Sequence, residues 1–172
     1  MTEKALVQDF NNLGIAEEFL KILKQNNFIS PTPIQQQAIG PAMEGKDIVG
    51  IAQTGTGKTL AFGLPLLQRL RGKNGLGLVI LPTRELAIQA DEMLHKIAGS
   101  LGLATAVLIG GEPIRKQMGA LRRRPNIIIG TPGRLVDHIN QGSLKLDSVK
   151  IIVLDEADRM LDIGFAPQIK KI

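Results

Sequence analysis

Residues 52–59, AQTGTGKT, bring together residue types that can bind a phosphate group. They follow an apolar run and precede the apolar segment LAFGLPLLQRL, as a loop between a strand and a helix does. Gly55 and Gly57 let the backbone curl around a phosphate, Lys58 adds a positive charge, and the hydroxyl of Thr59 can bind Mg²⁺. The spacing therefore predicts a phosphate-binding loop at the start of a helix.

Two alternatives to this loop fit the sequence less well. Ala52 stands where the usual pattern has its first glycine, so one alternative is a glycine-rich surface turn; the strand pattern before it and the helix pattern after it disfavour that interpretation. The other is a dinucleotide-binding fingerprint, but Leu60 occupies its third glycine position and no second GxGxxG occurs.

Acidic residues follow another apolar run, KIIVL, which leads directly into DEAD at residues 155–158. A carboxylate at the carboxyl end of a buried strand can face the phosphate loop. Asp155 is therefore a candidate to hold Mg²⁺ through its waters, and Glu156 to orient or activate an attacking water. The alternative makes Asp155 the N-cap of a helix with acids in its first turn; the phosphate loop upstream favours the catalytic interpretation.

The elements that must position these residues alternate between strand and helix. Apolar runs typical of buried strands lie at 47–52, 76–81, 104–110, 126–130 and 150–154. The clearest helix pattern between them lies in 84–102, where Gly102 can close the helix and one face carries Leu86, Ala90, Leu94, Ile97 and Leu101. Short connections between alternating elements imply right-handed βαβ units. The expected fold is doubly wound α/β, with a mostly parallel sheet covered by helices on both faces.

Residues 1–45 precede the first predicted strand and form an N-terminal extension with helices at 16–25 and 33–43. The second helix opens on TPIQ, in which Thr32 is the N-cap, Pro33 the first helical residue and Gln35 the partner of a capping box. The expected organisation is this extension followed by one domain at 46–172.

Composition narrows the function classes. The 172 residues suffice for a sizeable core, and the absence of Cys excludes disulfides, thiolate catalysis and Cys-ligated zinc. A net charge of +5, with clusters such as LRRR, suits a polyanion such as nucleic acid. With no Trp or Tyr and only five Phe, a platform of stacked bases is hard to build, so nucleic acid would be held by its backbone. The start of the chain lacks a signal-peptide core and no run is long enough to cross a bilayer, so we expect a cytoplasmic protein.

Several motifs in one order make the chain resemble a known family. From Phe10 to Phe165 it contains FISPTPIQ, AQTGTGKT, PTRELA, Gly110-Gly111, TPGR and DEAD. This order strongly resembles the N-terminal RecA-like domain of DEAD-box RNA helicases. The resemblance implies a P-loop ATPase of RecA-like fold that uses ATP and Mg²⁺, clamps single-stranded RNA and opens short duplexes locally.

The resemblance also implies roles for individual residues. Hydrolysis would rest on Lys58, Asp155 and Glu156, Mg²⁺ binding on Thr59 and Asp155, and coupling of the nucleotide site to RNA on Asp158. Nucleotide binding would involve Phe10, Phe28, Pro33, Gln35, Ala52, Gln53, Thr54, Gly55, Thr56, Gly57, Lys58 and Thr59. Contacts to the RNA backbone would come from Pro82, Thr83, Arg84, Gly110, Gly111, Thr131, Pro132, Gly133 and Arg134. The alternative to RNA contact at these motifs is a purely structural one, in which each forms a well-capped connection between a strand and a helix. Arg84 and Arg134 could equally be structural ion-pair partners.

The chain also departs from the family pattern. Asn27 replaces the glycine that commonly precedes the aromatic residue of the glutamine motif, a change expected to cost little if the backbone there stays in an ordinary region. After Phe165 the chain lacks the Ser-Ala-Thr motif and the second RecA-like domain, which supplies arginines facing the γ-phosphate. Because an arginine finger is worth about 10³ to 10⁵ in rate, the chain alone is expected to be nearly inactive and the functional polypeptide longer.

Three function classes stay open at this point. The leading one is an ATP-dependent RNA helicase, and the alternatives are a non-catalytic nucleotide-binding or adaptor module and a DNA-directed P-loop ATPase. Gln35 also has two competing roles. Its amide can cap its own helix, or it can pair with the N7 and N6 groups of adenine.

Overall fold

The computed structural model describes residues 9–172, so the expectation that the chain begins without a signal peptide lies outside the described residues. The chain divides into two compact units, residues 1–71 and 72–172. In the described part of the chain, no helix is both long and apolar enough to cross a membrane.

The first unit is helical. A short 3-10 helix (Phe10–Asn12) precedes α1 (Glu17–Gln25), α2 (Pro33–Met43) and α3 (Lys58–Leu70), and α2 packs against α3. Helix α1 buries Phe19, Ile22 and Leu23 on one side, as its apolar spacing requires. The two helices predicted at 16–25 and 33–43 are thus confirmed.

The strand predicted at 47–52 is wrong. These residues have no regular secondary structure and pair with no strand of the described chain, and the side chains of Val49 and Ile51 are 92% and 95% exposed. An apolar run indicates a segment that can be buried, but a strand also requires a neighbour that supplies its hydrogen bonds. No such neighbour reaches this segment here.

Asn27 adopts a left-handed backbone conformation with φ of +61°, so the condition under which its replacement of glycine was expected to cost little is not met. Asn is among the residues that tolerate this region, although glycine adopts it without a steric cost. We predict that Asn27→Ala lowers the free energy of unfolding by about 1 kcal/mol and that Asn27→Gly leaves it unchanged or raises it slightly. Urea denaturation of both variants measures this, and equal midpoints for the two would contradict the prediction.

The second unit is built on a parallel sheet of four strands: β1 (Leu76–Ile80), β2 (Thr105–Leu108), β3 (Ile127–Gly130) and β4 (Val149–Leu154). Their order is β2-β3-β1-β4, and every pairing is parallel. The four strands were predicted from their apolar runs and are confirmed. Strands β2 and β4 lie at the edges, and β4 leaves Ile152 and Leu154 exposed on one face.

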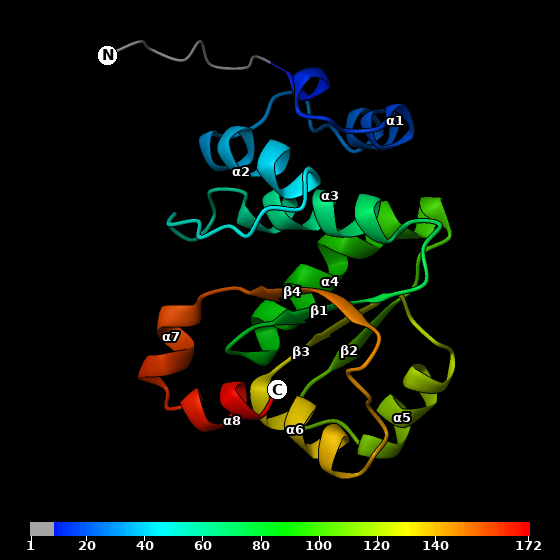
Figure 1. The fold of residues 1–172 in the computed structure, drawn as a ribbon, viewed down its shortest axis with the longest axis vertical. Helices are drawn as coiled ribbons and strands as arrows, with labels where there is room; N and C mark the ends of the chain where they lie inside the picture. The colour runs from blue at the N-terminus through cyan, green and yellow to red at the C-terminus, as the bar shows by residue number, and fades with distance from the viewer. Residues whose placement is uncertain (1–8) are drawn as a thin grey trace. The chain divides into compact units, whose positions relative to one another are not determined.

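Helices cover both faces of this sheet, as expected for a doubly wound fold. Right-handed crossovers place α4 (Arg84–Ala98) on one face and α5 (Ile114–Arg122) with α6 (Pro132–Asn140) on the other (Figure 1). Two short helices, α7 (Ala157–Asp162) and α8 (Ala166–Lys171), follow β4. The core on the α6 face contains Leu78, Ile80, Leu108, Ile128, Leu135 and Met160.

Helix α4 forms where it was predicted, but two residues of its apolar face are less buried than expected. Ala90, Leu94 and Ile97 are buried as predicted, whereas Leu86 and Leu101 are only half-buried. The α-helix ends at Ala98 and continues as a 3-10 turn (Gly99–Leu101), after which Gly102 takes a left-handed φ of +70°. Gly102 therefore closes the helix as its position predicted.

Candidate functional site

The phosphate loop is held in a tight turn by its glycines. Gly55 and Gly57 have φ values of +83° and +89°, a region that side chains disfavour, and α3 begins at the next residue, Lys58. The ammonium group of Lys58 donates a hydrogen bond to the carbonyl oxygen of Ala52 at 2.8 Å, which closes the loop on itself. The first backbone N–H groups of α3 have no partner within the helix, so they are available to an anion.

Gln35 packs directly against this loop. Its Nε2 donates to the carbonyl oxygen of Gly57 at 3.0 Å, and a Cβ atom on Gly57 would collide with the same amide. Its Oε1 accepts a hydrogen bond from the backbone N–H of Thr32 at 2.9 Å, which is the predicted capping contact. Gln35 is buried, and both ends of its amide are engaged. Pairing with adenine would therefore require the amide to leave these two partners.

The other residues expected near the nucleotide base lie in the same unit. Phe10 is buried in the first 3-10 helix, Phe28 is half-buried, and Pro33 is the exposed first residue of α2. In the loop itself, Thr56 donates from Oγ1 to the carbonyl oxygen of Gln53 at 2.6 Å. The side chains of Gln53 and Thr54 are exposed, whereas Thr59 is half-buried.

The DEAD residues follow β4 in a strained turn. Asp155 donates its backbone N–H to the carbonyl oxygen of Ile80 at 3.0 Å, so it prolongs the ladder between β4 and β1. Glu156 has φ of +51° and ψ of +47°, a left-handed conformation that costs a non-glycine residue about 1 to 3 kcal/mol and is often found at functional sites. The carboxylate of Glu156 lies 3.2 Å from Nη1 of Arg159.

The alternative in which Asp155 caps a helix is wrong. Helix α7 begins at Ala157, so the N-cap position falls on Glu156, whose side chain makes no capping hydrogen bond. Asp155 Oδ1 instead accepts from the backbone N–H of Glu156 at 3.1 Å. Asp158 lies exposed in the first turn of α7. Within residues 9–172, no three His, Cys, Asp or Glu side chains gather as a metal cluster; Mg²⁺ held by one carboxylate, waters and phosphates needs no such cluster.

The three segments expected to contact RNA all follow carboxyl ends of parallel strands in the second unit. Thr83 follows β1 and caps α4, because its Oγ1 accepts from the backbone N–H of Leu86 at 3.3 Å. The carboxylate of Glu85 accepts hydrogen bonds from its own backbone N–H and from the Thr83 hydroxyl, and these two bonds, the first more strongly, lower the pKa of Glu85. Thr131 follows β3 and occupies the N-cap position of α6, whose first residue is Pro132.

Contacts join these segments to one another. The guanidinium group of Arg84 lies against Gly111, whose φ is +78°, so that a Cβ atom there would collide with it. Nη1 of Arg134 donates to the carbonyl oxygen of Glu112 at 2.9 Å. The structure thus brings PTR, Gly110-Gly111 and TPGR together at one edge of the sheet. Arg134 is largely buried and committed to internal partners, as the structural alternative predicted, whereas Arg84 is exposed.

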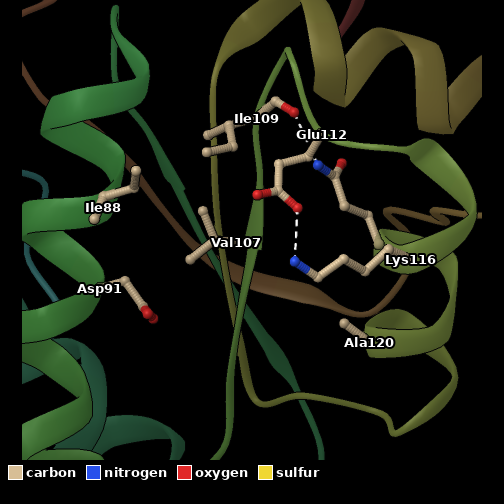
Figure 2. Close-up of a pocket in the computed structure, with 8 residues that line it drawn as sticks. Ile88, Asp91, Val107, Ile109, Glu112, Lys116 and Ala120 are labelled. Carbon is tan, nitrogen blue, oxygen red and sulfur yellow. Dashed lines mark hydrogen bonds and ion pairs between the residues drawn. The ribbon is translucent and has the colours of Figure 1, made fainter.

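A cavity that the sequence did not predict lies beside these segments. It measures about 260 Å³, and Figure 2 shows its lining from α4, β2 and α5. Glu112 and Lys116 form an ion pair of 2.8 Å at its wall, and the hydrogen bond and charge of Lys116 lower the pKa of Glu112. The floor is apolar, with Val107 and Ile109 from the edge of the sheet.

Comparison with known proteins decides the family. The model of the DEAD/DEAH box helicase family matches residues 32–172. The chain belongs to this family. The ATP-dependent RNA helicase CshA of Limosilactobacillus reuteri is 47% identical over 165 residues, which are 95% of this chain and 33% of that relative. The DEAD-box ATP-dependent RNA helicase CshA of Geobacillus kaustophilus is 46% identical over 165 residues, which are 95% of this chain and 35% of that relative. The chain therefore spans about a third of these relatives.

Solved structures of family members share the fold. A DEAD box protein from the hyperthermophile Methanococcus jannaschii superposes with a TM-score of 0.89 at 39% identity, over 96% of this chain and 46% of that one. The yeast DEAD-box splicing factor Prp28 superposes with a TM-score of 0.90 at 31% identity, over 96% and 42% of the two chains. The RecA-like fold expected from the motifs is thus confirmed.

Proposed function

We propose that this chain is the first motor domain of an ATP-dependent RNA helicase that hydrolyses ATP in response to RNA and opens short RNA duplexes locally. The observation that carries the proposal is the phosphate loop, in which two left-handed glycines lead into α3 and Lys58 closes the turn. A turn of this kind at the start of a 13-residue helix fits the phosphates of a nucleotide. The names of the relatives support ATP and RNA as the nucleotide and the substrate class.

In this proposal the phosphate loop and the residues around Gln35 hold the nucleotide, and Asp155 and Glu156 serve its hydrolysis. The first N–H groups of α3 and the ammonium group of Lys58 bind the phosphates, because they are the donors that the loop presents. Thr59 through its hydroxyl, and Asp155 through bound waters, are each assigned to Mg²⁺, which would neutralise charge on the phosphate oxygens. Glu156 orients the water that attacks the terminal phosphate. Phe10, Phe28, Pro33 and Gln35 surround the base.

RNA would bind by its backbone at the edge where the three segments meet. These segments offer N–H groups, the half-buried hydroxyl of Thr83, the exposed guanidinium of Arg84 and the bare backbone of Gly110, Gly111 and Gly133. Thr131 and Pro132 are buried in this structure, so their contact with RNA would require them to become accessible. Asp158, exposed at the start of α7, would couple nucleotide and RNA binding. We assign residues 1–45 to an extension that recognises adenine and residues 46–172 to the motor domain.

A second RecA-like domain completes the proposed enzyme. The relatives extend well beyond the part that this chain matches, since the chain covers only 33% and 35% of the two CshA proteins. We propose that the additional domain supplies the arginines that stabilise the transition state. Alone, the 172 residues are expected to hydrolyse ATP very slowly.

The test is the steady-state ATPase rate of the full-length polypeptide with RNA, with DNA of the same sequence and without nucleic acid. Strong stimulation by RNA alone is the expected result. Equal stimulation by DNA would favour a DNA-directed ATPase, and nucleotide binding without hydrolysis would favour an adaptor module. Either outcome would overturn the proposal.

Gln35 provides a test of base recognition. Gln35→Leu loses both the acceptor and the donor of the amide, so ATP loses two contacts to its base and GTP loses one, and the preference for ATP over GTP should fall about tenfold. Competition binding with ATP and GTP measures this, and Gln37→Leu, an exposed change on the same helix, is the matched control. Loss of the Gly57 contact alone would weaken both nucleotides equally, and an unchanged preference would leave Gln35 with its capping role only.

A further inference from the structure

Gln117 is a buried amide at the centre of a polar network that no sequence motif marks. It lies on α5 and is 4% exposed. Its Nε2 donates to the carbonyl oxygen of Ile109 at 2.8 Å. Its Oε1 accepts two hydrogen bonds, from Nη1 of Arg134 and from Nε2 of His138, each at 3.0 Å. Three of the four hydrogen bonds that an amide side chain can make are therefore formed.

The network holds both ends of the Gly110-Gly111 segment. Gln117 binds the carbonyl oxygen of Ile109 just before it, and Arg134 binds the carbonyl oxygen of Glu112 just after it. Two glycines in succession lose more conformational freedom on ordering than other residues and have no side chains to anchor them. The segment therefore depends on hydrogen bonds from α5 and α6 for its position.

His138 fixes the orientation of the Gln117 amide. His138 is fully buried, and because Oε1 of Gln117 accepts, Nε2 of His138 must carry the hydrogen. Nδ1 lies 2.8 Å from Oγ of Ser143, and in the neutral ring it accepts the hydroxyl hydrogen, for which the carbonyl oxygen of His138 at 3.1 Å is a second acceptor. Burial lowers the pKa of His138, the positive charge of Arg134 lowers it further, and Asp137 acts in the opposite direction. The lowered pKa favours the neutral ring, as this arrangement requires.

We propose that Gln117 and His138 are positioning residues for RNA binding: they fix the Gly110-Gly111 segment against the N-terminal end of α6, so that both present one continuous surface to the RNA backbone. The inference rests on the proposed function, because it concerns the same edge of the sheet. Neither side chain needs to touch RNA, since both are buried. Arg134 acts with them as the link between α6 and the glycines.

The first experiment compares Gln117→Met with Gln141→Met, an exposed glutamine at the end of α6, in the full-length polypeptide. Methionine has a similar shape but cannot donate to Ile109 or accept from Arg134 and His138. The RNA concentration that half-saturates ATPase stimulation should rise about tenfold in Gln117→Met, and the KM for ATP at saturating RNA should not change. Half-saturation equal to that of Gln141→Met would overturn the inference. A wild-type protein without RNA stimulation would instead overturn the proposed function.

The second experiment uses pH and keeps the inference testable if Gln117→Met does not fold. Protonation of His138 places a buried charge beside Arg134 and loosens the network, so the half-saturating RNA concentration of the wild type should rise as the pH falls below 6.5, the ordinary pKa of His. His138→Gln keeps a donor for Gln117 but cannot titrate, so this rise should be absent. Identical pH profiles for the two proteins would contradict the inference.

Discussion

Lys58→Ala is expected to lower ATP hydrolysis by the full-length polypeptide about 10²- to 10³-fold, the loss typical of removing one donor that stabilises charge in the transition state. The ammonium group has three hydrogens, so it can keep its bond to Ala52 while it donates to a phosphate. Its removal therefore takes away a phosphate ligand and also opens the turn that Gly55 and Gly57 form. The KM for ATP should rise as well, because both losses affect the bound nucleotide.

The matched control for this prediction is Lys73→Ala, which removes the same charge from an exposed residue outside the loop. The steady-state ATPase rate and the binding of a fluorescent ATP analogue measure the effect, and thermal unfolding checks that both variants fold. An unchanged hydrolysis rate in Lys58→Ala would show that the assigned phosphate site is wrong. A loss of equal size in Lys73→Ala would show that net charge, not the loop, controls the rate.

Local pattern predicted two helices and the four strands of the sheet correctly, but it also predicted a strand at 47–52 that the structure does not contain. Apolar spacing predicts helices α1 and α2 and the four strands of the sheet. Pro33 marks the start of α2, and Gly102 marks the end of α4. The strand expected at 47–52 has the same apolar character as β1, yet it forms no ladder. Hydrophobicity is a property of the segment itself, whereas pairing depends on a neighbour that the segment does not encode.

The candidate site also has one part that the sequence predicts and one part that it does not. The phosphate loop could be predicted because its glycines and lysine act within a few residues of one another. The Gln117 network could not, because Gln117 and His138 are 21 residues apart and meet only in the folded sheet. One signal was available: Gln117 lies three residues after Ile114 and four before Leu121, on the apolar side of its helix. A polar residue in such a position requires buried partners.

Glu156→Gln should separate catalysis from binding and from stability. The substitution keeps the size of the side chain and removes its charge and basicity, so hydrolysis should fall about 10²- to 10³-fold, within the range for loss of a general base. Gln meets the same backbone constraint at φ of +51°, so the strain at this residue should not change. The ion pair joins Glu156, whose side chain is 11% exposed, to Arg159, whose side chain is 54% exposed; an amide oxygen at position 156 can still accept from Arg159, so the loss of charge should change stability little.

The expected result for Glu156→Gln is thus a protein that binds ATP and unfolds like the wild type but hardly hydrolyses the nucleotide. Asp162→Asn is the matched control, because it removes one negative charge from an exposed residue at the other end of α7, the helix that Glu156 precedes. Single-turnover hydrolysis of ATP isolates the chemical step from product release, and RNA binding in the presence of ATP should persist in the variant. If ATP binding fell together with hydrolysis, Glu156 would be holding the nucleotide and its metal. Unchanged single-turnover hydrolysis would remove Glu156 from the catalytic residues.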